Sequence, residues 1–193
     1  KNAIIGSWDG CILLNLHNGN QYNIGHGYDN WVNAVNITPD GKRGLSGLQN
    51  FTCTLWNLDS GWQIKKFNRH HTSVSSVSIT SNGKQAISGS TDKTCILWDL
   101  YSGEELIVLK GHTESINTVS ISDDGKRALS GSSDNTCILW DLDSGEKIAQ
   151  FITSSPINSI SLFPNGVFGG ENSGEVFFLK ADRKLLCPGT PVV

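Results

Sequence analysis

The sequence predicts an all-β protein built from several copies of one four-stranded antiparallel sheet. Three observations support this fold class. Cysteines recur at a spacing of 42 residues, at Cys11, Cys53, Cys95 and Cys137, and the text around them is similar each time. Within each copy, polar and apolar residues alternate over short runs, as they do in half-buried strands. Clusters of Asp, Asn, Ser and Gly separate these runs and indicate tight turns.

The fourth copy shows the strands most clearly. We expect strands at 115–121, 126–132, 136–142 and 146–151, with a short turn between each strand and the next. Each turn contains Gly, Asp, Asn or Ser, which tolerate the backbone angles of tight turns. Four short strands joined in this way form an antiparallel meander.

Such a sheet has two apolar faces, so each copy has to stack on its neighbours. Radial stacking of four-stranded antiparallel sheets about an axis gives a β-propeller, in which each sheet is one blade. We assign about five blades: a partial blade at 1–25, which lacks its first strand, complete blades at 26–67, 70–109 and 112–151, and a degenerate blade at 157–187. In the degenerate blade we expect Phe178 to stand where the other copies carry Trp.

Composition limits the possible partners and locations. The net charge of −3 does not favour nucleic acid or an anionic membrane as a partner. No apolar run approaches the roughly 20 residues that span a bilayer. The repeated cysteines lie in apolar strands and too far apart to form disulfides, which indicates a reducing, cytoplasmic location. No Cys/His pair has zinc spacing, so we expect no metal site. We also expect no cofactor and no small-molecule substrate.

Several residues give the repeat a family resemblance. Trp98-Asp99 and Trp140-Asp141 end two third strands, and Gly111-His112 precedes the fourth copy. Together with the period, they resemble the WD-repeat β-propeller family over essentially the whole chain, and the near-identical copies are similar to those of prokaryotic and fungal members. Family members usually have seven blades, so the resemblance implies an incomplete part of a seven-bladed propeller. The absence of methionine also indicates a fragment.

The resemblance implies a hydrogen-bonded chain of side chains inside each blade. It runs from a His before the first strand to an Asp in the second turn, a Ser on the second strand and a Trp on the third. The expected members are His26, Ser46, Asn50 and Trp56 in copy two, His70, Ser88, Asp92 and Trp98 in copy three, and His112, Ser130, Asp134 and Trp140 in copy four. Copies one and five lack the set, so we expect them to rely on packing.

A catalytic interpretation of the same residues competes with the structural one. His, Ser and Asp form hydrolase triads, but here they recur in two copies without a nucleophile elbow. We therefore predict that the protein is not an enzyme. Two alternatives stay open: a purely architectural spacer, and a propeller enzyme with its site along the axis. The first strands offer such an enzyme only Asn33, Ser75, Asn117 and Asn158.

Candidate partner-binding residues lie at the variable tips of the copies. Residues 84–105 and 126–147 are identical at 16 of 22 positions, and the differences fall mainly at turns and strand flanks. A constant framework with changing tips is typical of a modular binding surface, although unrestrained loop drift gives the same pattern. The candidates are Trp8, Tyr28, Trp31, Gln49, Arg69, His71, Thr91, Glu114 and Ser133.

Aromatic residues and arginine are enriched at interface hot spots, which makes the tryptophans the first candidates. Trp8 occupies a turn that holds small or polar residues elsewhere, whereas Trp31 has an inward-packing alternative. We expect Trp62, at the start of a fourth strand, to pack at an edge or between blades.

The predicted function is a non-enzymatic protein–protein interaction scaffold. It binds a peptide or protein on the top face of the propeller, where the resemblance places the candidate tips. The resemblance also implies the sensor region of a larger signalling protein. The 193 residues contain neither a P-loop nor a kinase glycine-rich loop that would drive such signalling.

Overall fold

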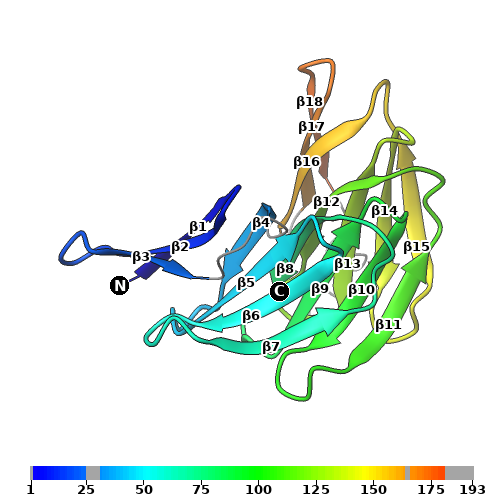
Figure 1. Ribbon diagram of the computed structural model, residues 1–193. Coiled ribbons are helices and arrows are strands. Elements are labelled where there is room, and N and C mark those ends of the chain that lie inside the picture. The colour runs from blue at the N-terminus through cyan, green and yellow to red at the C-terminus, as the bar shows by residue number, and fades with distance from the viewer. Residues whose placement is uncertain (1, 25–30, 164–165, 181–193) are drawn as a thin grey trace, which may run out of the picture.

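The computed structural model describes residues 2–24, 31–163 and 166–180, and every regular element in them is a β-strand. The strands form five separate antiparallel sheets, which Figure 1 shows arranged as a fan. Within these residues no strand of the last sheet pairs with the first sheet, so the fan is open. The same residues contain no helix with the length and apolar character needed to cross a bilayer. The predicted all-β fold of incomplete propeller blades is therefore confirmed.

Each sheet is a meander whose strands pair in chain order. The first sheet holds β1 (Asn2–Ser7), β2 (Gly10–Asn15) and β3 (Gln21–Ile24). The second holds β4 (Val32–Ile37), β5 (Arg43–Leu48), β6 (Thr52–Asn57) and β7 (Gln63–Asn68). The third holds β8 (Val74–Ile79), β9 (Gln85–Ser90), β10 (Thr94–Asp99) and β11 (Glu105–Lys110). The fourth holds β12 (Ile116–Ile121), β13 (Arg127–Ser132), β14 (Thr136–Asp141) and β15 (Lys147–Ile152). The fifth holds β16 (Ile157–Phe163), β17 (Gly166–Glu171) and β18 (Val176–Lys180).

Glycine makes the turn between first and second strands possible. Gly41, Gly83 and Gly125 occupy the same place in successive sheets, with φ of 69°, 66° and 71°. A residue with a side chain is strained in this left-handed region, and glycine is not. The repeated glycine thus fixes the same tight turn in three sheets.

Neighbouring sheets meet through a glycine and a branched side chain. The first strands β4, β8, β12 and β16 lie side by side along the inside of the fan (Figure 1). At each junction, a glycine faces the β-branched residue that begins the next sheet; this glycine lies in β1 of the first sheet and in the second strand of the others. The pairs are Gly6 with Val32, Gly47 with Val74, Gly89 with Ile116, and Gly131 with Ile157. A Cβ on any of these glycines would lie 2.6–2.7 Å from a methyl carbon of its partner, so only glycine allows this approach.

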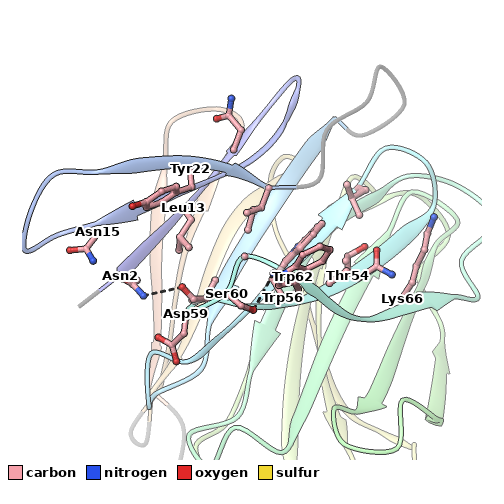
Figure 2. Close-up of a pocket in the computed structure, with 16 residues that line it drawn as sticks. Asn2, Leu13, Asn15, Tyr22, Thr54, Trp56, Asp59, Ser60, Trp62 and Lys66 are labelled. Carbon is pink, nitrogen blue, oxygen red and sulfur yellow. Dashed lines mark hydrogen bonds between the residues drawn. The ribbon is translucent and has the colours of Figure 1, made fainter.

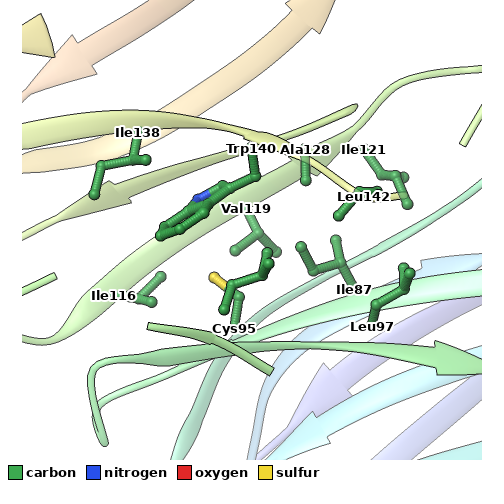
Figure 3. Packing of buried hydrophobic residues seen from close by; sticks show 11 residues of the cluster. Ile87, Cys95, Leu97, Ile116, Val119, Ile121, Ala128, Ile138, Trp140 and Leu142 are labelled. Carbon is green, nitrogen blue, oxygen red and sulfur yellow. The ribbon is translucent and has the colours of Figure 1, made fainter. Parts of the chain in front are cut away.

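Apolar side chains fill the spaces between sheets. Figure 3 shows the cluster between the third and fourth sheets, where Ile87, Cys95 and Leu97 of one sheet face Ile138 and Trp140 of the other. All five side chains are at most 2 % exposed. Burying one large aliphatic or aromatic side chain contributes about 1.5–3 kcal/mol, so this packing holds the sheets together.

The four cysteines of the described residues are free and buried, as the sequence predicts. Burial raises the pKa of the Cys53 and Cys137 thiols to about 12 and that of Cys11 to about 11. Hydrogen bonds to Ser46 and Ser88 of the next sheet act in the opposite direction on Cys11 and Cys53, but more weakly. The thiols therefore stay protonated and serve as small packing groups.

The register of the fifth sheet corrects one expectation. Leu179 pairs with Val167, as Trp140 pairs with Ala128 in the fourth sheet. Leu179, and not Phe178, therefore takes the position of the repeated Trp. The sequence comparison was wrong by one residue because adjacent apolar residues in Val176–Lys180 give no alternation to fix the register.

Candidate functional site

A chain of four side chains crosses the third sheet. The two ring nitrogens of His70 lie 2.9 Å from Asp92 Oδ2 and 2.7 Å from Ser88 Oγ. The indole N–H of Trp98 donates to the same Ser88 oxygen at 2.8 Å. Thr94 extends the chain, because its hydroxyl donates to Asp92 Oδ1 at 2.6 Å.

The fourth sheet repeats this geometry. His112 lies 2.9 Å from Asp134 Oδ2 and 2.7 Å from Ser130 Oγ. The Trp140 indole N–H donates to Ser130 Oγ at 2.8 Å, and the Thr136 hydroxyl donates to Asp134 Oδ1 at 2.6 Å. Because each buried polar group meets a partner, the chain removes the desolvation cost of its members.

One proton assignment satisfies every member of the fourth-sheet chain. Trp140 donates to Ser130, the Ser130 hydroxyl donates to Nε2 of a neutral His112, and Nδ1–H of His112 donates to the Asp134 carboxylate. Burial lowers the pKa of His112, which favours this neutral form. Burial acts to raise the pKa of Asp134, but hydrogen bonds from Thr136, the Thr113 N–H and His112 outweigh it and lower the pKa to about 2.

These shifts predict an acid-labile fold. The pKa of His112 is below its ordinary 6.5 in the folded protein, so the unfolded chain binds a proton first as the pH falls. The free energy of unfolding should therefore decrease as the pH falls below about 7, through the ordinary 6.5 of a histidine. A further loss should follow below the ordinary 3.8 of Asp134, as the pH falls towards its folded value of about 2. Urea titrations at several pH values, followed by circular dichroism, measure both steps.

A His112→Gln variant is the control for the first step. Glutamine does not titrate, so the free energy of unfolding of this variant should decrease less steeply than that of the parent as the pH falls below about 7. Equal slopes in the parent and the variant would mean that His112 does not cause the loss.

The second sheet has a shorter version of the chain among the described residues. The Trp56 indole N–H donates to Ser46 Oγ at 2.9 Å. Asn50 takes the position of the Asp and accepts a hydrogen bond from the Thr52 hydroxyl at 2.7 Å. His26 lies outside the described residues.

The His–Ser–Asp connectivity has the order of a catalytic triad, but the serine is inaccessible. Ser88 and Ser130 are both 0 % exposed, and the hydroxyl of each also accepts the indole N–H. A nucleophile has to reach its substrate, so this arrangement supports structure and not acyl transfer. Within the described residues, no three His, Cys, Asp or Glu side chains gather in a way that could hold a metal ion.

The polar residues of the first strands link neighbouring sheets. Asn33 Nδ2 donates to the Val74 carbonyl at 2.9 Å, and Asn117 Nδ2 donates to the Ile157 carbonyl at 2.9 Å. The Ser75 hydroxyl donates to the Ile116 carbonyl in the same way. Three of the four groups that an axial enzyme site could have used therefore hold the next sheet. The fourth, Asn158, donates from Nδ2 to Asn172 Oδ1 at 3.2 Å within the fifth sheet.

Trp8 and Trp31 form an exposed aromatic pair. Their ring centroids are 5.5 Å apart and their planes differ by 23°, so the rings stack. Trp8 lies in the turn between β1 and β2 and is 75 % exposed, whereas Trp31 directly precedes β4 and is 49 % exposed. The pair spans the first and second sheets and leaves ring surface open to solvent. The inward-packing alternative for Trp31 is therefore wrong.

The corresponding contact between the second and third sheets is polar. Gln49 Oε1 accepts hydrogen bonds from the Ser73 hydroxyl at 2.7 Å and from Asn33 Nδ2 at 3.3 Å. Thr91 and Ser133, at the same turn in later sheets, bond mainly within their own sheet, to Thr72 and Asn117. The aromatic pair thus stands where the neighbouring tips carry polar side chains.

The remaining candidates interact with residues other than the aromatic pair. Arg69 forms an ion pair with Glu105 at 2.6 Å, which directs it towards the outer strand of the third sheet. Glu114 lies 3.8 Å from Lys93, and His71 is exposed and donates its backbone N–H to Asp92. The structure shows no contact between these residues and the aromatic pair. Tyr28 lies outside the described residues.

Sequence reasoning missed a cleft between the first and second sheets. It has a volume of about 1050 Å³ and is lined by residues of both sheets, including Tyr22, Thr54, Trp62 and Lys66. Trp62 is 77 % exposed at this cleft, so the expectation that it packs is wrong. The sequence contained a signal for the exposure of Trp62. Glu104 and Glu146 occupy its position in the next two copies, and glutamate is almost never fully buried.

Comparison with known proteins gives one family match. The model of the WD domain, G-beta repeat, matches residues 19–57, 61–99 and 103–141, together more than half of the chain. Each of the last two matched segments starts before the final strand of one sheet and ends with the third strand of the next. No curated protein matches the chain.

Proposed function

This chain belongs to the WD-repeat family, and we propose that it is a non-enzymatic scaffold that binds a peptide or protein segment at the tips of its sheets. WD repeats generally mediate protein–protein interactions. The proposed contact surface is centred on Trp8 and Trp31, with Gln49 as its nearest polar neighbour among the candidates.

The exposed stacked pair is the observation that carries this proposal. Large aromatic side chains dominate interface energetics because they bury much apolar area at little cost in conformational entropy. Here two such rings are fixed against each other, one 75 % and the other 49 % exposed. The third and fourth sheets carry Ser73 and Ser115 at the position of Trp31, and they have no aromatic pair there. Folding of a sheet therefore does not require the pair.

The buried state of the His–Ser–Asp chains and the structural use of the first-strand polar residues support the non-enzymatic part of the proposal. A cytoplasmic location fits the buried free thiols. A sensor role within a larger signalling protein rests on family resemblance alone.

Peptide display on the immobilised chain tests the proposal. Selected peptides should bind the parent and should lose at least about tenfold in affinity for a Trp8→Ser variant, since a buried aromatic anchor contributes about 2 kcal/mol or more. Serine is chosen because Ser133 occupies the same turn in the fourth sheet, so the variant is expected to fold.

Trp62→Glu is the matched control, since it removes an equally exposed tryptophan away from the tips. It should leave peptide affinity unchanged. If selection yields no binder, or if the binders tolerate Trp8→Ser, the proposed surface is incorrect.

A further inference from the structure

The cleft between the first and second sheets is lined by side chains of both sheets. Figure 2 shows Leu13 and Tyr22 on the first sheet, and Thr54, Trp56 and Trp62 on the second, around one cavity of about 1050 Å³. The least exposed part of the lining is mostly apolar, with Leu13, Ile24 and Trp56 only 5 %, 6 % and 7 % exposed, but it includes the Thr54 hydroxyl, whose residue is 3 % exposed. A volume near 1000 Å³ lies at the upper end of the range for small-molecule sites, which is about 300–1000 Å³.

The sequence of the second copy creates the open wall. Strand pairing places Thr54 and Lys66 at the positions held by Ile96 and Val108 in the third sheet. Ile96 is 1 % exposed and, with Val108, packs against the core between the second and third sheets. Replacing these two aliphatic side chains by a hydroxyl and an ammonium group leaves the corresponding junction of the second sheet less filled and more polar.

Two aromatic rings stand at the mouth of the cleft. Trp62 is 77 % exposed and Tyr22 is 54 % exposed, and they come from opposite sheets. At the position that corresponds to Tyr22, the third sheet carries Ile107, which packs on the apolar cluster between the third and fourth sheets. The Tyr22 hydroxyl accepts a hydrogen bond from Asn20 Nδ2 at 3.3 Å, which restrains its ring. Exposed rings at a cavity mouth offer faces for a planar aromatic ligand.

Charge distinguishes the two ends of the cleft. Lys66 lines it from β7, and none of the described carboxylates forms an ion pair with this lysine. Asp59 lines it from the turn before β7, and Figure 2 places it on the opposite side of the cleft from Lys66. An acidic ligand group is therefore favoured only near Lys66, where it meets an unpaired cation.

We infer that this cleft binds a small planar aromatic carboxylate, with the ring between the apolar lining and the Tyr22 and Trp62 rings and the acid group at Lys66. This inference departs from the sequence-based expectation of no small-molecule substrate, which did not take the cleft into account. The inference is independent of peptide binding at the tips, because the two surfaces share no residue.

Binding of 2-naphthoate to the full chain tests the inference. With tryptophan labelled by ¹⁵N, each of the six indole groups gives one nuclear magnetic resonance signal. Titration should shift the signals of Trp62 and Trp56 and leave those of Trp8 and Trp31 in place. For a ligand of this size we expect a Kd of about 1 mM or below.

Two further probes separate the ring from the charge. Neutral 2-naphthalenemethanol keeps the ring and should bind about fivefold more weakly, since it cannot pair with Lys66. Cyclohexanecarboxylate keeps the acid without the aromatic ring and should shift the Trp62 signal at least about tenfold less at equal concentration.

The variants use residues that the chain already carries at the same positions. Lys66→Val installs the residue of position 108, and Trp62→Glu installs the residue of positions 104 and 146. Lys66→Val should weaken 2-naphthoate binding by up to about fivefold and Trp62→Glu by at least about fivefold, whereas the tip variant Trp8→Ser should bind as the parent does. Circular dichroism of each variant confirms that it is folded.

Three outcomes would overturn the inference: no shift of the Trp62 signal, equal binding by both cleft variants and the parent, or equal shifts at Trp8 and Trp62. The last would indicate unspecific adsorption to exposed rings. None of these outcomes bears on peptide binding at Trp8 and Trp31, which the display experiment tests separately.

Discussion

Replacing Trp140 with alanine is expected to lower the free energy of unfolding by about 3–5 kcal/mol. The indole is 2 % exposed and packs in the cluster between the third and fourth sheets. Its removal would leave a large cavity, and it would also take away the N–H that donates to Ser130 at 2.8 Å. Urea unfolding followed by circular dichroism measures the loss, and a value below about 1 kcal/mol would contradict the packing described.

Two further variants separate packing from hydrogen bonding. Trp140→Phe keeps most of the ring but has no donor for Ser130, so it should cost about 1–2 kcal/mol. Trp62→Ala removes a tryptophan that is 77 % exposed and should change stability by no more than about 0.5 kcal/mol. If the two alanine variants lose the same free energy, burial between sheets is not what stabilises this fold.

Gly131→Val is expected to destabilise the protein by about 2–3 kcal/mol. A Cβ at this position would lie 2.6 Å from Ile157 Cγ2 and 2.9 Å from Thr118 Cγ2, and both of those side chains are packed between sheets. The φ angle of Gly131 is not in the left-handed region, so valine suits the strand itself. The loss would therefore measure how closely the fourth and fifth sheets approach.

Gly170 provides a matched control for this substitution. It occupies the same place in β17 as Gly131 does in β13, but nothing lies within 4 Å of a Cβ built there. Gly170→Val should be neutral or slightly stabilising, since valine favours strands. Thermal or urea unfolding of both variants side by side gives the comparison, and an equal loss would point to a backbone effect instead of a clash.

The repeat allowed much of the fold to be predicted. The ends of the strands expected at 115–121, 126–132, 136–142 and 146–151 differ from those of β12 to β15 by one residue at most. The network members of the third and fourth copies lie within hydrogen-bond distance of one another, because each copy supplies the same polar residues at the same strand positions. The register of the fifth sheet was predicted wrongly by one residue, because that copy lacks the repeated Trp and its apolar residues do not alternate.

The candidate surface was only partly predictable. Sequence comparison singled out Trp8 and Trp31 separately, but not that their rings stack across two sheets. It grouped Arg69 with them, whereas the structure pairs Arg69 with Glu105. Side chains at the tips are positioned by neighbouring sheets, and a pattern that repeats within one copy carries no information about such contacts.

By itself, the sequence determined the kind of sheet, the number of copies and the buried polar chain within a copy. These features depend on the alternation of polar and apolar residues, on turn residues and on the repeat period of 42 residues, all of which can be recognised in the sequence. Only the tertiary structure decided which exposed tryptophans pair, where two sheets leave a cleft, and that Lys66 lines it. Those properties arise from the distance between one sheet and the next, and that distance depends on how side chains from two copies fit together.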